Sequence, residues 1–145
     1  MVVYEDRWLV REFVPEDYGQ VAFVWKETKL SRPERADNLE TIMRTIDHGG
    51  IFYVLEDLDT KKIIGTSWIT NDGRRLHLQY FGILPEYQGR KLSHYLLEHS
   101  LDFARQTGLQ IKLEVHKTNI IAKNLYEKWG FKKLDGYEIY ILRDL

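Results

Sequence analysis

The chain passes from a predicted strand to a predicted helix through Leu84-Pro85-Glu86-Tyr87-Gln88-Gly89-Arg90-Lys91-Leu92-Ser93. Residues 75–84 alternate apolar and polar side chains, as a half-buried strand does. Residues 89–107 carry an apolar stripe at helical spacing, and Gly108 closes it. A helix start offers free backbone N–H groups, so the junction is a candidate site for a phosphate or pyrophosphate. The alternative is an ordinary turn on which Arg90 and Lys91 are simply solvated.

The segments on either side of this junction predict an α+β fold around one mixed sheet. Pro15 opens a first helix, and a second runs from about residue 34 to 47. Strands are expected at 8–13, 51–57, 62–71, 75–84 and 110–115, and a further helix at 119–129. A final hairpin pairs 131–134 with 137–142 across Asp135-Gly136. Gly82 lies inside the strand before the junction, where it indicates a bulge or a close backbone approach.

The composition is typical of a single globular domain. The chain has 145 residues and a mass of 17.3 kDa. It has no cysteine, which excludes disulfides, cysteine-based zinc sites and a catalytic thiol. The net charge of −1 argues against nucleic acid as a partner. We find neither an apolar run of membrane-spanning length nor a signal peptide, and therefore expect a cytoplasmic protein without a membrane partner.

A second block of sequence resembles a known family. It reads Asn119-Ile120-Ile121-Ala122-Lys123-Asn124-Leu125-Tyr126-Glu127-Lys128-Trp129-Gly130-Phe131 and is similar to the Asn-x-x-Ala-x-x-Leu-Tyr-Glu-Lys-x-Gly-Phe signature of the GNAT superfamily of acyl-CoA-dependent N-acetyltransferases. The family's phosphate motif, Gln/Arg-x-x-Gly-x-Gly/Ala, falls on Gln88, Lys91 and Ser93, and only the first position matches. The resemblance implies a single GNAT-like domain over residues 1–145, with about seven strands flanked by about four helices.

The resemblance also implies where acetyl-CoA binds as the co-substrate. The pantetheine arm would lie like an extra strand where strands 75–84 and 110–115 splay apart, pairing around Gly82 and Ile83 with Leu84 nearby. Asn119 would contact the same arm. The backbone N–H groups that would hold the pyrophosphate belong to Gln88, Gly89, Arg90, Lys91, Leu92 and Ser93. Lys91 either neutralises the phosphate or weakens CoA binding, because it places a side chain where the family often has glycine.

Two catalytic residues follow from the same resemblance. Tyr126 would be the general acid that returns a proton to the departing thiolate, a role open to a phenol within hydrogen-bond reach. Glu114 would be the general base, at the spacing found in the ribosomal-protein N-terminal acetyltransferase branch. The alternatives are a core tyrosine at position 126 and, at position 114, a solvated strand glutamate or one held in an ion pair. Other candidates for the base are His116, which shares a strand face with Glu114 in the predicted strand, and His77, Gln79 and Tyr80.

These residues predict an N-acetyltransferase that moves an acetyl group from acetyl-CoA to a primary amine by direct attack in a ternary complex. The acceptor would be a small-molecule amine or a protein or peptide amine, and no metal is expected. The sequence leaves open whether the protein forms a homodimer. The second hypothesis is a non-catalytic acyl-CoA-binding or regulatory domain on the same fold. Lys29, Arg32 and Arg35 cluster between the first two helices, where they mark either an acidic acceptor or a solvated loop.

Overall fold

The structure is a computed structural model that describes the backbone of residues 1–145 and every side chain except that of Pro33. The chain divides into two compact units, Met1–Leu113 and Glu114–Leu145. The first unit holds a six-stranded sheet in the order β1-β2-β3-β4-β5-β6. The strands are β1 (Val2–Tyr4), β2 (Trp8–Glu12), β3 (Ile51–Asp57), β4 (Lys62–Asn71), β5 (Arg75–Ile83) and β6 (Gln110–Leu113). The predicted α+β class with one mixed sheet is confirmed.

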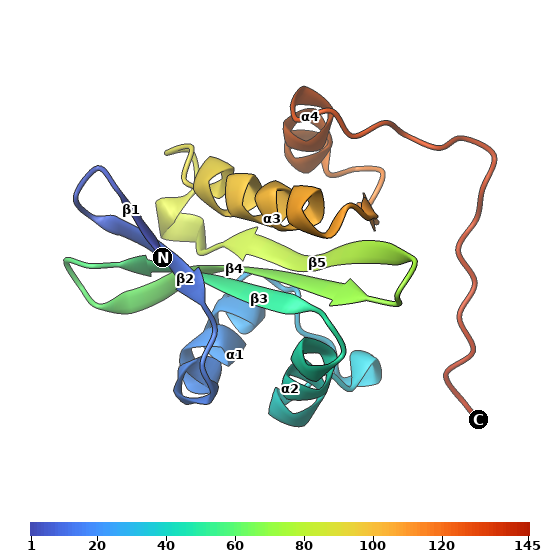
Figure 1. The fold of residues 1–145 in the computed structure, drawn as a ribbon, viewed down its shortest axis with the longest axis horizontal. Helices are drawn as coiled ribbons and strands as arrows, with labels where there is room; N and C mark the ends of the chain where they lie inside the picture. Colours follow the sequence, from blue (N-terminus) through green and yellow to red (C-terminus); the bar gives the residue numbers. More distant parts are fainter. The chain divides into compact units, whose positions relative to one another are not determined.

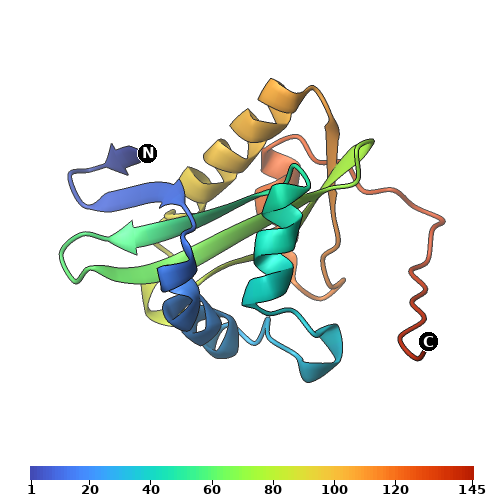
Figure 2. The ribbon, with the colours of Figure 1, turned by 60° about the horizontal axis from the view of Figure 1, so that its bottom comes forward.

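The sheet is antiparallel from β1 to β5, and β6 joins β5 in parallel. Figure 1 shows helix α3 (Ser93–Thr107) on one face of the sheet and helices α1 (Tyr18–Glu27) and α2 (Leu39–Asp47) on the other. Short 3-10 turns, η1 (Pro15–Asp17), η2 (Pro33–Arg35) and η3 (Pro85–Tyr87), precede the three helices. The turned view in Figure 2 shows α1 and α2 side by side under the strands.

The core lies between the sheet and the pair α1 and α2. Trp25 of α1 stacks on Trp68 of β4 at 5.9 Å and contacts Phe52 of β3 at 6.0 Å. All three are buried. The polar ends of the two tryptophans are satisfied, since Trp25 Nε1 donates to Thr66 Oγ1 and Trp68 Nε1 donates to Thr45 Oγ1. Burial of these large aromatic side chains holds α1 against this face of the sheet.

Two helices begin later than the sequence pattern predicted, and the backbone gives the reason. The helix expected from residue 89 begins at Ser93, because Gly89 (φ +79°) and Lys91 (φ +62°) are left-handed and cannot belong to an α-helix. The helix expected from about residue 34 begins at Leu39. Ala36 is left-handed there (φ +55°), and the Asn38 side chain caps the helix by accepting from Thr41 N at 2.9 Å.

The strand prediction was wrong at the two ends of the chain. The structure has an additional strand, β1, which pairs with β2 across a turn in which Glu5 and Asp6 are left-handed. The strand expected over 110–115 ends at Leu113. The sheet has six strands where about seven were expected, because β1 is added and neither strand of the predicted final hairpin forms.

The second unit contains one helix, α4 (Ile120–Lys128), and no strand among its described residues. The predicted hairpin over 131–134 and 137–142 is wrong. The turn at Asp135-Gly136 does form, with Gly136 at φ +87°, but no strand pairing follows it. A hairpin without a neighbouring strand is marginal in water, which is the physical reason that the turn signal alone was insufficient. No helix among the described residues is long and apolar enough to cross a membrane.

Candidate active site

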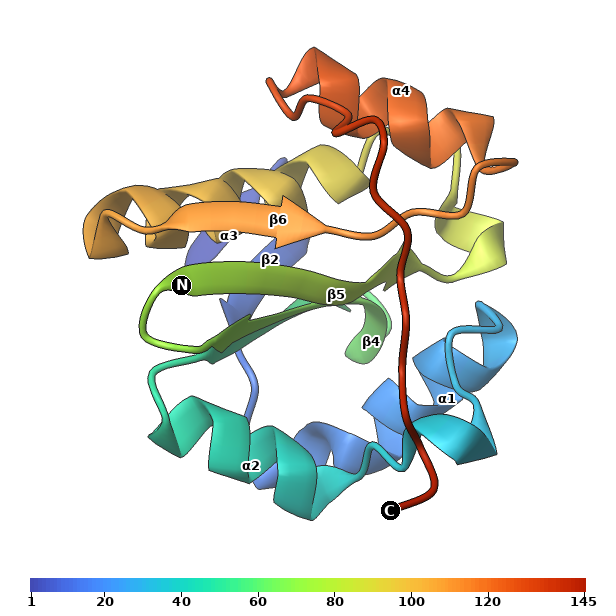
Figure 3. The ribbon, with the colours of Figure 1, turned by 90° about the vertical axis from the view of Figure 1, so that its right-hand side faces the viewer.

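The candidate cofactor site begins where β5 and β6 part. The two strands pair from Arg75↔Gln110 to Leu78↔Leu113, and β5 then continues through residues 79–83 beyond the last paired position. Figure 3 shows β6 beside the first half of β5 only. The pairing ends in the region where the resemblance predicts that the two strands splay apart. An extended ligand could add to such an edge through main-chain hydrogen bonds.

Gly82 and Ile83 lie at the end of this β5 edge. A Cβ on Gly82 would lie 3.1 Å from Leu30 Cδ1 and 3.7 Å from Thr28 Cγ2. The neighbours of Gly82 are therefore side chains, not backbone. Of the two expected explanations, the bulge is confirmed, because the β4–β5 pairing shifts between Thr66, the partner of Gly82, and Trp68. Leu84 is the next residue and is buried. Its N–H donates to Ile64 O at 2.8 Å, and this bond holds the backbone in place where the chain turns toward α3.

The segment between η3 and α3 presents a run of backbone donors. The N–H groups of Gly89, Arg90, Lys91, Leu92 and Ser93 have no hydrogen-bond partner among the residues that the structure describes. They stand at the N-terminal end of the fifteen-residue helix α3, where the helix dipole favours negative charge. Leu92 contributes a buried side chain to the core, which holds the segment against the sheet. The segment has the donors that a pyrophosphate needs.

Gln88 fixes the start of this segment to the end of β5. Its side-chain amide Nε2 donates to the Ile83 carbonyl oxygen at 2.8 Å. Gln88 is the one position of the phosphate motif that matches the family, and this bond gives it a structural role. The backbone at Lys91 is strained, because a left-handed φ of +62° is costly for a residue with a side chain.

Arg90 lies over two aromatic rings. Its guanidinium carbon is 5.5 Å from the Trp8 ring centroid and 5.6 Å from that of Tyr87. Together with Glu5, Arg7 and Leu92, Trp8 and Arg90 line a cavity of about 270 Å³. The Arg90 side chain is thus positioned beside the donor segment through cation–π contacts.

A buried carboxylate ties η3 to the strands. Asp57 is fully buried and accepts from Arg7 Nε at 2.9 Å, from Arg7 Nη2 at 3.0 Å and from the Tyr87 hydroxyl at 3.2 Å. The hydrogen bonds from Arg7 hold the pKa of Asp57 below its ordinary value, against the opposing effect of burial. The sequence analysis did not identify Asp57, because neither its burial nor its partner fifty residues away is visible in the local pattern.

The second unit carries the other predicted site residues. Tyr126 is buried, and its ring meets that of Phe131 edge-on at 5.6 Å. Burial raises the pKa of Tyr126 to about 12, so the phenol keeps its proton at neutral pH. Asn119 caps α4, since its side chain accepts from Ala122 N at 3.1 Å. This capping gives Asn119 a structural role besides the predicted contact with the cofactor.

The argument that placed Glu114 and His116 on one strand face was wrong. Strand β6 ends at Leu113, so neither residue belongs to it. Both are exposed, and the His116 ring bonds to Thr118 Oγ1 at 2.8 Å. Of the other candidates for the base, His77, Gln79 and Tyr80 lie on β5, and the Gln79 amide donates to Thr70 Oγ1 at 3.1 Å.

Within the first unit, the structure brings together the β5 edge, Gln88 and the N-terminal donors of α3, which is the arrangement expected of an acyl-CoA-binding acetyltransferase fold. The acetyltransferase (GNAT) family profile matches residues 8–131, and the chain belongs to this family. Family members use acetyl-CoA as the acyl donor.

Solved structures share the fold. An acetyltransferase from Streptococcus agalactiae is 21% identical, with a TM-score of 0.77 over 94% of this chain and 92% of that one. The PaiA N-acetyltransferase of Thermoplasma acidophilum, solved with coenzyme A, is 19% identical, with a TM-score of 0.73 over 90% and 92%. A predicted acetyltransferase of Clostridium acetobutylicum, solved with acetyl-CoA, is 15% identical, with a TM-score of 0.72 over 92% and 96%.

Proposed function

We propose that this protein is an acetyl-CoA-dependent N-acetyltransferase that acetylates a primary amine by direct attack in a ternary complex. The observation that carries the proposal is the end of the β5–β6 pairing at Leu78↔Leu113, next to the unpartnered N–H groups of residues 89–93. The pantetheine arm lies along β5 around Gly82 and Ile83, and Gly89 to Ser93 hold the pyrophosphate. Bound acetyl-CoA supplies the acetyl group as a thioester.

The chain's own residues handle the protons of this reaction. As the amine nitrogen bonds to the acetyl carbon and the carbon–sulfur bond breaks, Tyr126 donates its phenolic proton to the leaving sulfur. The phenol is protonated at neutral pH, as a general acid must be when the reaction starts. Glu114 accepts the proton that the amine loses. Asn119 contacts the cofactor arm through its amide.

The pKa of the acceptor amine decides how strong a general base the reaction needs. At pH 7, freeing a lysine amine costs about 4.6 kcal/mol, but freeing an α-amine costs only about 1–1.4 kcal/mol. Of these two acceptors, an α-amine makes the smaller demand on a general base. The spacing of Glu114 and Tyr126 is similar to that of the ribosomal-protein N-terminal acetyltransferase branch. We therefore include the α-amine of a protein among the acceptors to be tested.

A second candidate function is a non-catalytic acyl-CoA-binding domain. The observation that favours it is the strained lysine at position 91, whose side chain occupies a place where the family often has glycine. In that case the fold keeps the cofactor segment but has lost efficient turnover. The retained Tyr126 and Asn119 argue for the enzyme.

Two measurements with the full chain separate the candidates. Calorimetric titration with acetyl-CoA tests binding, and release of the CoA thiol over a panel of small amines and peptide α-amines tests turnover. Binding together with turnover supports the enzyme, and binding without turnover of any amine supports the regulatory domain. Absence of binding to both CoA and acetyl-CoA would refute both.

A further inference from the structure

Tyr80 lies in a strained bulge of β5. Thr66 of β4 pairs with Gly82, but Trp68 pairs with Gln79, so Ser67 alone stands opposite two β5 residues. Tyr80 has a left-handed φ of +49°, which is uncommon for a bulky residue within a strand. Strained backbone of this kind persists only where the surrounding structure holds it, and it often serves function.

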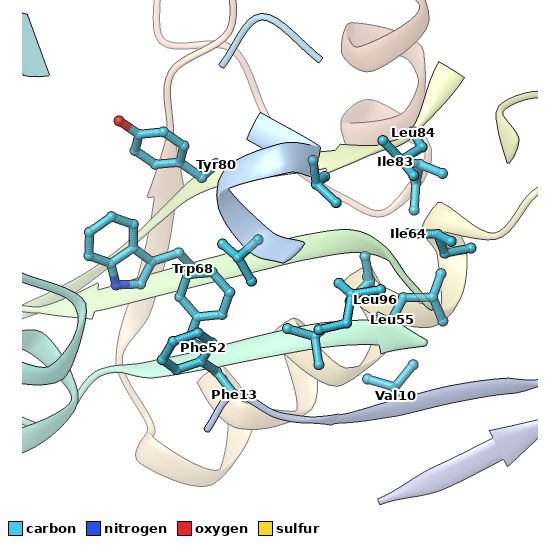
Figure 4. Packing of buried hydrophobic residues seen from close by; sticks show 14 of the residues in the cluster. Val10, Phe13, Phe52, Leu55, Ile64, Trp68, Tyr80, Ile83, Leu84 and Leu96 are labelled. Atoms are coloured by element: carbon cyan, nitrogen blue, oxygen red, sulfur yellow. The ribbon is translucent and has the colours of Figure 1, made fainter. Parts of the chain in front are cut away.

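The bulge decides which face of the sheet Tyr80 occupies. Gln79 bonds to Thr70 Oγ1, and in a regular strand Tyr80 would point to the opposite face. Instead the Tyr80 ring packs against Trp25 of α1 at 4.2 Å and Trp68 at 5.5 Å. The Tyr80 hydroxyl points out of this aromatic cluster, as Figure 4 shows.

That hydroxyl bonds to a carboxylate on the connection between α1 and α2. It donates to Asp37 Oδ2 at 2.6 Å, and Asp37 is half-buried. Burial and the bond to Asp37 raise the pKa of Tyr80 above its ordinary range, so the phenol remains a donor. The strained bulge thus delivers a fixed hydrogen-bond donor to Asp37.

Arg35 lies near this bond without an acidic partner of its own among the described residues. Arg35 and Asp37 are two residues apart, yet neither makes an ion pair with any residue that the structure describes. Arg35 Nη1 donates to Leu30 O at 2.9 Å, and its guanidinium carbon is 5.6 Å from the Tyr80 ring centroid. The guanidinium is held at two points and keeps donors available. A stacked, preorganised guanidinium of this kind suits a carboxylate or phosphate.

Arg35 belongs to the connection that covers the proposed cofactor edge. Leu30, whose carbonyl accepts from Arg35, also has the side chain nearest to the Cβ position of Gly82. A molecule reaching the thioester from this face of the sheet would therefore pass close to the guanidinium.

We propose that Arg35 binds an anionic group, a carboxylate or a phosphate, on the acceptor amine. Tyr80 and Asp37 are positioning residues, because the bond from the Tyr80 hydroxyl holds the Asp37 carboxylate where it makes no ion pair with Arg35. The acceptor class is therefore an amine that carries its own acidic group. The inference rests on the proposed acetyltransferase function for the place of the reacting amine.

The first test uses three amines of one chain length: 6-aminohexanoate and 6-aminohexyl phosphate, which carry an anionic group, and hexylamine, which carries none. Their affinities for the full chain are measured by calorimetry, with and without CoA. At least one anionic probe should bind about tenfold more tightly than hexylamine, with a preference that falls as salt rises. The tighter of the two anionic probes identifies the acidic group. Equal binding of all three probes, or binding of none, overturns the proposal.

Matched variants locate the effect. Arg35→Gln should abolish the preference for the anionic probe, whereas Arg44→Gln should keep it, because Arg44 is an exposed arginine of α2 and the charge change is the same. An unchanged preference in Arg35→Gln overturns the proposal. The affinity of Arg35→Gln for acetyl-CoA should equal that of the parent. If the parent fails to bind acetyl-CoA, the proposed enzyme function fails, while a preference that depends on Arg35 still supports this anion site.

A rescue experiment tests the positioning role. Tyr80→Phe removes the donor to Asp37, which then pairs with Arg35, so the preference for the anionic probe should fall about three- to tenfold. Adding Asp37→Asn should restore it, since an amide cannot neutralise a guanidinium. A merely structural role for Tyr80 would give no rescue, and that result would contradict the positioning role.

Discussion

The amide of Gln88 donates to the carbonyl oxygen of Ile83 at 2.8 Å, and this bond joins the last residue of β5 to the segment that leads into α3. The two residues flank the turn η3. The edge proposed for the pantetheine arm and the donors proposed for the pyrophosphate are thereby held in one geometry. Preorganisation of this kind improves affinity, because binding then orders less of the protein.

We expect Gln88→Ala to weaken acetyl-CoA binding about five- to tenfold, since the donor segment loses its tie to β5. Calorimetry or a thermal-shift titration measures the effect. Gln106→Ala is the matched control, because Gln106 is an exposed residue near the end of α3. Equal affinities in Gln88→Ala and the parent would show that the bond to Ile83 does not organise the cofactor site.

Lys91→Gly should stabilise the free protein by about 1 kcal/mol, because glycine adopts a left-handed φ without the cost that a side chain imposes. For a chain of this length, that change raises the Tm by a few degrees. Lys91→Ala keeps a Cβ and should show no such gain. A Tm of Lys91→Gly at or below that of Lys91→Ala would contradict the argument from strain.

The same two variants separate the two roles of Lys91 in cofactor binding. If the lysine charge neutralises the phosphate, Lys91→Ala should weaken acetyl-CoA binding about three- to tenfold. Lys91→Gly should bind nearly as well as the parent, because the closer approach of the backbone offsets the lost charge. Tighter binding by Lys91→Ala would show instead that the lysine hinders the cofactor.

The lowered pKa of Asp57 predicts how the free energy of unfolding depends on pH. Because Arg7 lowers its pKa in the folded protein, Asp57 contributes stability above its unfolded pKa of about 3.9, and that contribution is lost as pH falls through the folded value. Urea unfolding should therefore show a declining free energy below about pH 4. Asp57→Asn should flatten this decline. Asp59→Asn, which leaves the bonds between Arg7 and Asp57 in place, should keep the slope of the parent.

Local sequence patterns were sufficient to locate a strand of the sheet and the helix that packs against it. The alternation in residues 75–84 and the stripe in 89–107 located β5 and α3. The start of α3 was missed, because nothing in the sequence marks Lys91 as left-handed. The hairpin after residue 130 was overestimated, because a turn signal at Asp135-Gly136 says nothing about a pairing partner. In both cases the outcome depends on contacts between residues that are far apart in the sequence, and a short stretch of sequence does not contain them.

The candidate site was predictable only in part for the same reason. Gln88 was recognised from the phosphate motif, and Gly82 from its position within a predicted strand. Arg35, Asp37 and Tyr80 come together through a bulge whose left-handed residue is a tyrosine, and periodicity gives no sign of that. Asp57 depends on Arg7, which lies in the turn between β1 and β2. Side chains that act through long-range hydrogen bonds therefore needed the structure.

Tyr126→Phe tests the proposed general acid. Phenylalanine keeps the ring and its edge-on contact with Phe131, so the Tm and the affinity for acetyl-CoA should change little. Loss of the phenolic proton should slow the chemical step about 10²–10⁴-fold. Burial raises the pKa of Tyr126 to about 12, so the parent enzyme keeps this proton throughout an assay range of about pH 7–10. The defect of the variant should shrink toward high pH, because a thiol with a pKa near 8.5 then leaves as thiolate without help. The measurement is the single-turnover rate of CoA release with an accepted amine across that range. A rate equal to that of the parent at every pH would make Tyr126 a structural tyrosine, and the leaving thiolate would then depart without a proton from this residue.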